Sequence, residues 1–136
     1  MKLLQYIIND IKPLSSKSKV SELQLLFNQL SYSHIPMANN DGAFIGSFFE
    51  TDAHCFESEK PLEEYMYAAE RFFVRDTTIW LDVLEAFAQN HANIMPVLSR
   101  ENKYLGYYEL NDVIGLFNET PFFAENGGIL IVEKGV

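Results

Sequence analysis

The chain repeats itself at a fixed distance of 60 residues, and no gap is needed between the two copies. The residues that recur are those that instruct the backbone: a proline after an aliphatic residue, a glycine ten positions later, and an aspartate six beyond that. The matching pairs are Pro36 and Pro96, Gly46 and Gly106, Asp52 and Asp112, Phe27 and Phe87, and Gln29 and Gln89. Two copies in one register predict a supersecondary unit built twice. Two are too few for a solenoid, so we expect two units packed face to face with paired clefts between them.

Length and composition narrow the class of protein. A chain of 136 residues, 48% hydrophobic and 14% aromatic, is expected to form one globular body. Its formal charge of −9, with the ten Lys and Arg residues scattered, argues against nucleic acid and anionic lipid as partners. Cys55 is the single cysteine, which excludes an intrachain disulfide. The longest aliphatic run, residues 129–132, is too short to span a membrane. The sequence therefore predicts a soluble cytoplasmic protein.

Each copy predicts the same series of elements. An extended approach segment (residues 8–14 and 72–74) precedes a hydroxyl residue, Ser18 or Thr78, that suits a helix N-cap. A helix with one apolar face follows, carrying Val20, Leu23, Phe27 and Leu30 in the first copy and Trp80, Val83, Leu84 and Phe87 in the second. A helix docking on a core explains this stripe fully.

Two short strands complete each copy. The first strand (residues 35–37 and 94–98) contains a proline, which lacks an amide donor and is expected at a strand start or edge. Polar turns at 39–42 and 99–102 lead into second strands over 44–49 and 104–108, each with an interior glycine that marks a close approach of backbone or ligand. Short helices over 53–56 and 113–118 are expected to begin at Asp52 and Asp112. The predicted fold is α+β (mixed α/β): tandem β-α-β-β-α units related by pseudo-twofold symmetry.

The predicted organisation has four parts. Residues 1–56 form the first repeat, 57–70 a linker helix, 71–118 the second repeat and 119–136 a C-terminal tail. The tail turns at Pro121 and Gly127-Gly128 and enters a strand over 129–132 that lies close to the last residue. Such a strand either completes a sheet edge or begins a further domain. We favour the second interpretation, in which the chain is a fragment.

Two pairs of segments carry a family resemblance: residues 34–37 (His-Ile-Pro-Met) with 46–52, and residues 93–97 (Asn-Ile-Met-Pro-Val) with 106–112. Each pair resembles a CBS (cystathionine-beta-synthase-type) repeat. The resemblance covers roughly residues 8–118, and its strength lies in the duplication. Segments 6–14 and 122–136 are similar to bacterial two-repeat proteins of the acetoin-utilisation type, which often carry a further ligand-binding domain.

The resemblance implies a Bateman module, a CBS pair that commonly forms a homodimer and binds AMP, ATP or S-adenosylmethionine between its repeats. The family's aspartate, here Asp52 or Asp112, accepts hydrogen bonds from ribose hydroxyls, and a carboxylate suits a cis-diol well. Backbone at residues 33–36 and 93–96 lines the adenine pocket. The candidate ligand-binding residues are Asp52, Asp112, His34, Ile35, Pro36, Phe49, Met95, Pro96 and Glu109.

The sequence departs from the family pattern three residues after each strand glycine. Nucleotide-binding members usually place Ser or Thr there, whereas this chain has Phe49 and Glu109. A lost hydroxyl contact costs about 1 kcal/mol, but a carboxylate beside a phosphate repels it by several kcal/mol at worst. We therefore expect that at least one cleft is empty or takes a ligand without phosphate, and that a sulfonium suits Glu109 better than ATP does.

Each candidate also has a plain structural interpretation. Asp52 and Asp112 suit helix caps as well as ribose contacts. His34 precedes a buried strand and is expected to be a hydrogen-bonded structural histidine. The tyrosines at 104, 107 and 108 are expected in the core and interface, although one can stack on a purine. A metal site at Asp52, His54 and Cys55 is disfavoured, because a helix turns these residues to different faces.

Three functions remain open. The leading one is a regulatory sensor of an adenosyl ligand that acts on an attached or partner protein. The second is a ligand-free homodimerisation module whose clefts are filled by Phe49 and other aromatic residues. A small enzyme is the least favoured, since the chain has no Gly-x-Ser-x-Gly elbow, phosphate-binding Gly-rich loop ending in Lys, or His-Glu-x-x-His motif. We expect no required cofactor and no metal.

Overall fold

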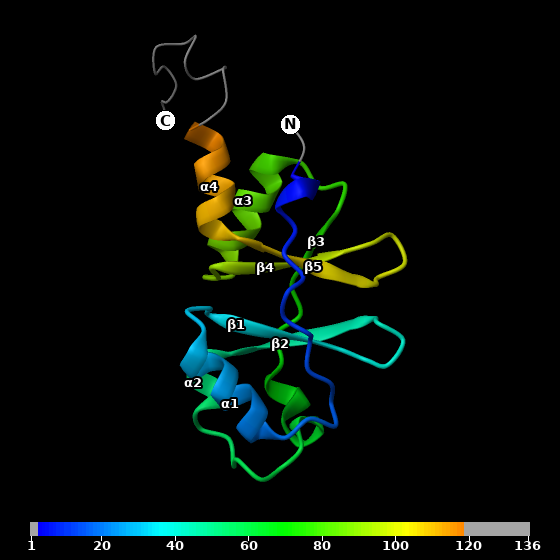
Figure 1. The fold of residues 1–136 in the computed structure, drawn as a ribbon, viewed down its shortest axis with the longest axis vertical. Helices are drawn as coiled ribbons and strands as arrows, with labels where there is room; N and C mark the ends of the chain where they lie inside the picture. Colours follow the sequence, from blue (N-terminus) through cyan, green and yellow to red (C-terminus); the bar gives the residue numbers. More distant parts are fainter. Residues whose placement is uncertain (1–2, 119–136) are drawn as a thin grey trace.

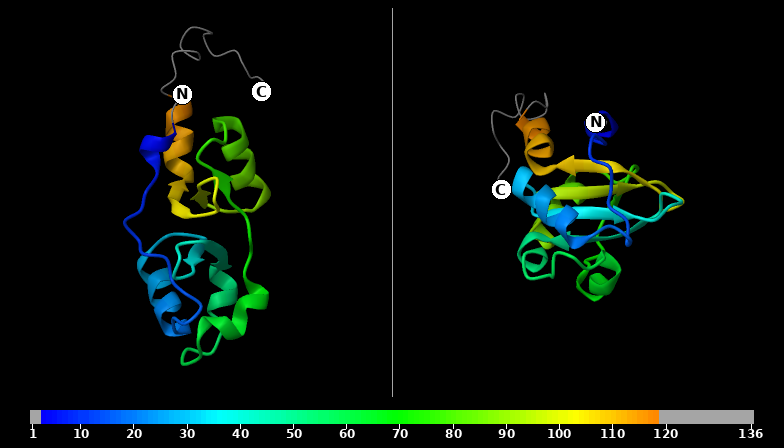
Figure 2. Two further views of the ribbon diagram at one scale, coloured as in Figure 1. Left: turned by 90° about the vertical axis from the view of Figure 1, so that its right-hand side faces the viewer. Right: turned by 60° about the horizontal axis from the view of Figure 1, so that its bottom comes forward.

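The computed structural model describes residues 3–118, which form two stacked units (Figure 1). The first unit holds α1 (Val20–Gln29), β1 (His34–Ala38), β2 (Phe44–Phe49) and α2 (Glu50–Ala53), and the second holds β3 (Val74–Arg75), α3 (Trp80–Gln89), β4 (Ile94–Leu98), β5 (Tyr104–Glu109) and α4 (Leu110–Asn118). Two 3-10 helices, η1 (Leu4–Tyr6) and η2 (Leu62–Ala68), lie on the segments before each unit. The β-hairpins face each other and the helices lie outside them (Figure 2). No helix among residues 3–118 is long and apolar enough to cross a membrane.

The two units keep the 60-residue offset in their backbone. The helices α1 and α3, and both strands of each hairpin, begin at equivalent positions. The register is the same too: His34 pairs with Phe49 in the first hairpin and Ile94 with Glu109 in the second. Even the irregularity falls at equivalent places, between Met37 and Ala38 and between Val97 and Leu98. The predicted tandem β-α-β-β-α fold is confirmed.

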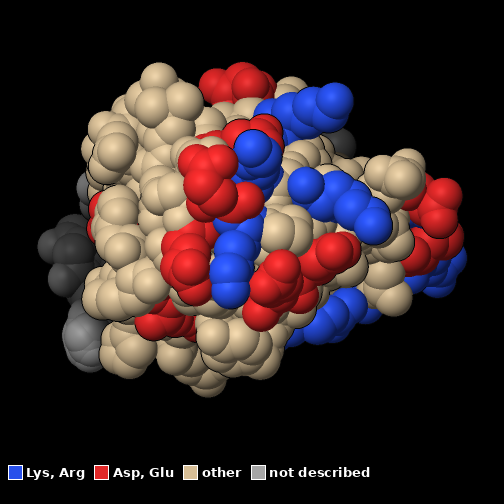
Figure 3. All heavy atoms as spheres, turned by 90° about the horizontal axis from the view of Figure 1, so that it is seen from below, with Lys and Arg blue, Asp and Glu red and all other residues tan. Residues whose placement is uncertain are grey.

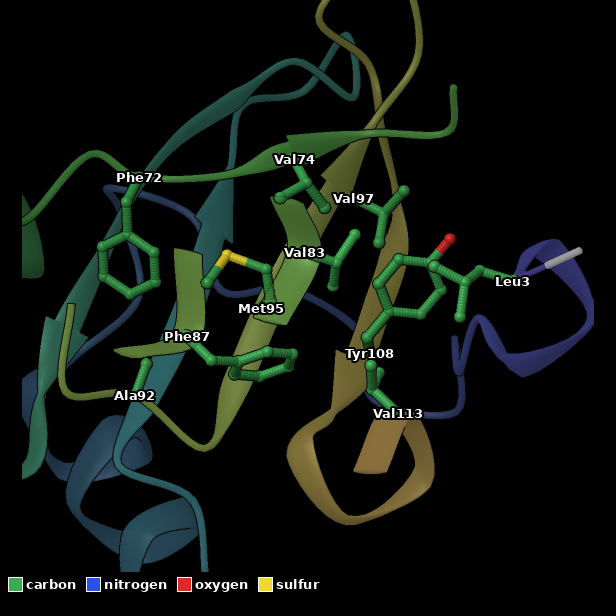
Figure 4. Packing of buried hydrophobic residues seen from close by; sticks show 10 residues of the cluster. All are labelled: Leu3, Phe72, Val74, Val83, Phe87, Ala92, Met95, Val97, Tyr108 and Val113. Carbon is green, nitrogen blue, oxygen red and sulfur yellow. The ribbon is translucent and has the colours of Figure 1, made fainter. Parts of the chain in front are cut away.

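Each unit has its own hydrophobic core under its long helix. Val20, Leu23 and Phe27 of α1 are buried in the first core, as Val83 and Phe87 of α3 are in the second. Figure 4 shows the second core, in which Leu3 from the far N-terminal end lies beside Tyr108. Leu62, on the segment between the units, is fully buried in the first core. Each core is therefore completed by chain from outside its hairpin and helices.

The segments that precede the two repeats cross between the units (Figure 1). The N-terminal segment pairs with the second unit at Ile8 and Tyr107, then reaches the first unit, where Leu14 pairs in parallel with Met37. The segment before the second repeat does the reverse. Glu70 pairs with Ser47 of the first unit, and β3 then pairs in parallel with β4. Each crossing segment therefore ties one repeat to the other.

The crossing segments explain the strand glycines. Gly46 and Gly106 have φ of +152° and +143°, a region that side chains disfavour. A Cβ at Gly46 would lie 3.3 Å from the carbonyl oxygen of Glu70, and one at Gly106 only 2.4 Å from that of Ile8. The close neighbour that the sequence predicted at each glycine is thus protein backbone.

The hydroxyl residues before the long helices do not cap them. The helices begin at Val20 and Trp80, and Lys19 and Ile79 stand at the N-cap positions without a side-chain cap bond. The Ser18 and Thr78 hydroxyls instead accept hydrogen bonds from amides three residues earlier, those of Ser15 (3.1 Å) and Arg75 (2.8 Å). The predicted N-caps are wrong because these side chains close the preceding turn, a local bond that competes with capping.

Asp52 and Asp112 are also not helix starts. The helices α2 and α4 begin earlier than predicted, at Glu50 and Leu110, so each aspartate lies in the first turn. An acidic side chain there is favoured by the helix dipole and needs no cap bond. The plain interpretation of both aspartates is therefore dipole complementarity rather than capping.

Three further expectations concern Pro96, the helix between the repeats and the C-terminal strand. Pro96 lies inside the central strand β4, which is tolerated because β3 pairs only with Val97 and Leu98. The helix expected within 57–70 is the 3-10 helix η2, kinked at Tyr65 and packed on the first core. The strand expected over 129–132 lies outside the described residues.

Candidate functional site

The surfaces where the two hairpins face each other carry most of the predicted site residues. The side chains of Phe48 and Tyr108 lie in the two cores, so those of their neighbours in the strands point to the opposite face. This places Ser47 and Phe49 of β2, and Tyr107 and Glu109 of β5, between the repeats. His34, Pro36 and Pro96 alternate with core residues in the same way. Ile35 and Met95 themselves are core residues, so only their backbone is able to line a site there.

Residues at equivalent positions touch each other at both ends of this face. At one end, Ser33 and Asn93 form two reciprocal hydrogen bonds, of 2.8 and 3.0 Å. At the other end, the Phe44 and Tyr104 rings stack with centroids 6.4 Å apart, and the hairpin turns pair through Ala43 and Lys103. Contacts between equivalent residues must lie near the symmetry axis. The pseudo-twofold axis therefore runs along the strands, between the two hairpins.

On the side of the first repeat's predicted site, five residues form what we call the His34 cluster: His34, Ser47, Phe49, Asp52 and Glu70. The His34 imidazole is 1% exposed and lies against the Phe49 ring, at 5.2 Å between centroids. Its Nδ1 is 2.8 Å from the Ser33 hydroxyl and its Nε2 is 3.3 Å from a Glu70 carboxylate oxygen. His34 is thus hydrogen-bonded on both nitrogens, as predicted for a structural histidine.

The carboxylate of Glu70 indicates the tautomer of His34. Because an ionised carboxylate only accepts hydrogen bonds, Nε2 carries the ring proton toward Glu70. Nδ1 then accepts from the Ser33 hydroxyl, whose oxygen accepts from the Asn93 amide. Burial lowers the pKa of His34, while the charges of Glu70 and then Asp52 act in the opposite direction. The ring is therefore held neutral in a cluster that contains two carboxylates.

Ser47 is the anomaly of this cluster. Its side chain is fully buried, and its hydroxyl has no hydrogen-bond partner among the described residues. The neighbouring backbone bonds do not use it, because the Ser47 and Glu70 amides and carbonyls pair with each other at 2.8 Å. A buried hydroxyl without a partner is costly, by about 1 to 3 kcal/mol. The cluster therefore has an unused hydrogen-bonding group that faces the space between the repeats.

In the second repeat, side-chain hydrogen bonds occupy the positions equivalent to Ser47 and Phe49. Tyr107 stands where the first repeat has Ser47, and its hydroxyl donates to Asp10 at 3.0 Å. The Tyr32 hydroxyl lies 2.9 Å from that of Tyr107 and donates a short hydrogen bond to Glu109. We call Asp10, Tyr32, Tyr107 and Glu109 the Glu109 cluster. It joins the N-terminal segment, the first repeat and the second repeat.

Burial and acidic neighbours act together on the phenols of this cluster. Burial, followed by the hydrogen bond to Glu109, raises the pKa of Tyr32 to about 12. Burial also raises the pKa of Tyr107, helped by its bonds to Tyr32 and Asp10. Both phenols therefore stay protonated as donors at physiological pH. Sequence reasoning identified Glu109 but not its partners, because Asp10 and Tyr32 lie far from it in the chain.

Two cavities of the described residues lie elsewhere, beside the N-terminal segment. One, of about 890 Å³, lies between residues 10–15, α1 and the first hairpin turn. The other, of about 440 Å³, is bounded by residues 9–13 and Tyr104. None of the nine predicted ligand-binding residues lines either cavity.

Other charged groups of residues 3–118 form ion pairs and hydrogen bonds at the surface. Among residues 3–118, no three His, Cys, Asp or Glu side chains are grouped to hold a metal ion. His54 instead faces Glu50 at 3.8 Å, and the Cys55 thiol contacts the Thr51 carbonyl. On the face seen from below in Figure 3, basic and acidic side chains are interspersed. Lys60 and Glu57 of the described residues form an ion pair at 3.2 Å.

Comparison with known proteins identifies the fold. The sequence matches no protein-family model and no curated protein. The structure is similar to a CBS domain pair/ACT domain protein from Thermotoga maritima (18% identity, TM-score 0.77, 88% of this chain and 98% of that one). It is also similar to the CBS domains of a transcriptional regulator from Streptococcus pneumoniae (17%, 0.73, 85% and 98%). A third similar structure is that of CBSX2 in complex with AMP (12%, 0.72, 87% and 96%). The chain has the fold of a CBS domain pair.

Proposed function

We propose that this CBS pair is a regulatory module that senses an adenosyl-containing small molecule between its repeats and transmits binding to an attached or partner protein in the cytoplasm. One observation carries the proposal: at equivalent positions, the second repeat is closed by side-chain hydrogen bonds, whereas the first keeps the buried Ser47 hydroxyl unused. The similar structure of CBSX2 holds AMP, which supports an adenosyl ligand.

The His34 cluster offers the contacts that such a ligand needs. Asp52 is close enough to act on the pKa of His34, and its carboxylate suits the two hydroxyls of a ribose. The half-buried Phe49 ring provides a face for stacking on a purine. Backbone at residues 33–36 is the proposed adenine wall. Pro96 and Asp112 belong to the matching arrangement of the second repeat, where the Glu109 cluster occupies the face.

The charges of the cluster select against phosphate. Glu70 and Asp52 are acidic, and burial keeps His34 neutral rather than cationic. A phosphate in this position would meet carboxylates without a compensating positive side chain of the cluster. We therefore propose adenosine or S-adenosylmethionine before AMP, and AMP before ATP.

The effect of ligand binding would pass through the contact between Ser33 and Asn93, which lies next to the proposed ligand. Ser33 bonds both His34 and Asn93, so a ligand that moves His34 acts directly on the link between the repeats. A ligand that favours one relative orientation of the repeats shifts that equilibrium by its difference in affinity.

The resemblance of segments 6–14 and 122–136 to acetoin-utilisation-type proteins stays a prediction.

A thermal-shift series with adenosine, S-adenosylmethionine, AMP, ADP, ATP and NAD tests the proposal. A ligand at a hundred times its dissociation constant stabilises by about 2.7 kcal/mol, a shift of several degrees. The repeat supplies a matched control: Asp52→Ala should abolish the shift and Asp112→Ala should keep it. Tight ATP binding that is lost in Asp112→Ala would overturn the assignment of ligand and repeat.

The alternative is a ligand-free homodimerisation module. Specific support comes from large apolar side chains exposed on the second repeat, such as Leu81 and Ile114, which are 62% and 44% exposed. No thermal shift with any of the six ligands, together with a concentration-dependent dimer, would favour this function.

A further inference from the structure

Each crossing segment is attached to the two hairpins by one backbone pairing on each. The four pairings are Ile8 with Tyr107, Leu14 with Met37, Glu70 with Ser47, and Val74 with Val97. The partners on the hairpins are equivalent positions of the two repeats, 60 residues apart. Residues 9–13 lie between the pairings of the first segment, but only residues 71–73 lie between those of the second. The first segment is therefore two residues longer than its counterpart.

The additional length makes residues 9–13 a loop, which we call the 9–13 loop. Within residues 3–118, none of its backbone amides or carbonyls forms a hydrogen bond. In this part of the chain its one hydrogen bond is made by the Asp10 carboxylate, which accepts from the Tyr107 hydroxyl at 3.0 Å. The loop is thus fixed at its two ends and at Asp10, and its backbone polar groups are available to other partners.

The 9–13 loop borders both cavities described above. All of its residues line the cavity of about 440 Å³, and residues 10–13 line the cavity of about 890 Å³. Pockets that hold small organic molecules in proteins have volumes of roughly 300 to 1,000 Å³. The larger cavity therefore has a suitable size for such a molecule.

Leucine side chains from α1 and its C-terminal end form an apolar wall of the larger cavity. Leu25, Leu26 and Leu30 are spaced so that they share one side of the helix. Leu26 and Leu30 are partly buried against the first core, whereas Leu25 is 56% exposed. An apolar body placed in this cavity would remove the exposed Leu25 side chain from water, which is favourable.

Three charged side chains border the cavities: Asp10, Lys12 and Glu22. Both carboxylates already accept hydrogen bonds, Asp10 from the Tyr107 hydroxyl and Glu22 from the Lys19 amide at 2.9 Å. Lys12, which lines both cavities, makes no ion pair and no side-chain hydrogen bond within residues 3–118. The charge left without a partner beside the apolar wall is therefore positive.

We propose that the 9–13 loop and α1 form a binding site for a small organic acid, whose carboxylate pairs with Lys12 and whose apolar body lies against Leu25, Leu26 and Leu30. This site is separate from the His34 cluster, none of whose residues lines either cavity. It gives the module a second input beside the proposed adenosyl ligand. Because Asp10 belongs to the same loop, a bound acid acts directly on the bond between the loop and Tyr107.

Three probes with one apolar body test the class of ligand: phenylbutyrate, phenylbutanol and phenylbutylamine. Each is titrated into the whole chain while two-dimensional amide NMR spectra are recorded. We expect saturable shifts confined to residues 9–15 and 22–30, with the acid bound more tightly than the alcohol and the amine. Equal or tighter binding of the alcohol or the amine, shifts centred on the His34 cluster, or no saturable shift would each overturn the proposal.

Substitutions of exposed residues test the two contacts without disturbing the fold. Lys12→Gln should weaken binding of the acid about threefold to fivefold and leave that of the alcohol unchanged, as expected for an exposed ion pair. Leu25→Ser should weaken binding of both. Lys17→Gln is the matched control, since Lys17 is exposed and lines neither cavity, and it should bind the acid like the unmodified protein.

Two further outcomes would contradict the assignment. Equal weakening by Lys12→Gln and Lys17→Gln would reduce the effect to the overall charge of the protein. Shifts of the same amides with protein concentration, in the absence of a probe, would assign the cavity to a second copy of the chain. No adenosyl compound is present in these experiments, so their result is independent of the proposed sensing function.

Discussion

Ser33 and Asn93 hold the same position in the two repeats and hydrogen-bond to each other in both directions. The Ser33 amide donates to the Asn93 side-chain oxygen at 2.8 Å, and the Asn93 amide donates to the Ser33 hydroxyl at 3.0 Å. The Asn93 side chain also donates to the Ser31 carbonyl. Because Ser33 continues to His34, this pair connects the pseudo-twofold axis to the candidate ligand site.

Asn93→Ala should weaken the junction between the repeats. It removes two hydrogen bonds that the asparagine side chain makes, each contributing about 1 kcal/mol, so we expect a loss of about 1 to 2 kcal/mol in the free energy of unfolding. Urea denaturation measures it. Asn28→Ala, at an exposed position of α1, is the control and should change stability by less than about 0.5 kcal/mol. Equal effects of the two substitutions would contradict this role.

The strand glycines should differ in their tolerance of alanine. A Cβ at Gly106 would lie 2.4 Å from the Ile8 carbonyl oxygen, whereas at Gly46 the nearest atom is 3.2 Å away. We expect Gly106→Ala to cost about 3 kcal/mol and Gly46→Ala about 1 to 2 kcal/mol. Gly115→Ala is the control, since α4 has open space there, and it should stabilise by about 0.5 to 1 kcal/mol. Equal costs at Gly46 and Gly106 would show that the crossing segments do not hold these positions tightly.

His34 should make stability depend on pH in the acid range. Burial lowers the pKa of this imidazole, so an unfolded chain binds a proton below about pH 6.5 that the folded protein resists. The stability contributed by neutral His34 is therefore complete above this pH and is lost as pH falls below it. Thermal unfolding of the unmodified protein and His34→Gln, compared across this range, should show a smaller loss on acidification in the variant. The exposed His54→Gln should keep the loss of the unmodified protein.

Much of the fold follows from the sequence because the repeated residues restrict the local backbone conformation. Pro36 and Pro96, with the polar turns after them, fix both hairpins, and the apolar stripes of α1 and α3 fix the faces that dock. The helix starts at Ser18 and Thr78 were wrong because a hydroxyl able to cap a helix also closes the turn before it, and residue type does not distinguish these uses.

The exchange of crossing segments was not predictable in the same way. Ile8 and Tyr107 are separated by most of the chain, and nothing in the local pattern of either residue specifies the pairing. The glycine at 106 signalled a close neighbour without identifying it. The same applies to the Glu109 cluster, whose residues come from three separate parts of the chain. Side chains brought together by tertiary structure leave no periodic signal in the sequence.

The repeats also differ on the outer surface, and this difference predicts how the chain self-associates. Leu81 and Ile114 are exposed on α3 and α4, which are joined by the Trp80 indole donating to the Val113 carbonyl. The equivalent residues of the first repeat are Ser21 and His54, which are polar. An apolar surface formed by two neighbouring helices of one repeat is best covered by a second copy of that repeat. We therefore expect a homodimer through α3 and α4.

Replacing these two residues with their counterparts, Leu81→Ser and Ile114→His, should weaken the dimer at least about tenfold in dissociation constant, equivalent to about 1.4 kcal/mol. Sedimentation equilibrium over a range of concentrations measures it. Leu25→Glu, which copies Glu85 onto the exposed face of α1, is the matched control and should leave the constant within about twofold if the contact lies on the second repeat. A monomer mass at all concentrations, or a dimer sensitive only to Leu25→Glu, would place self-association elsewhere and leave the exposed side chains of α3 and α4 free for the regulated partner.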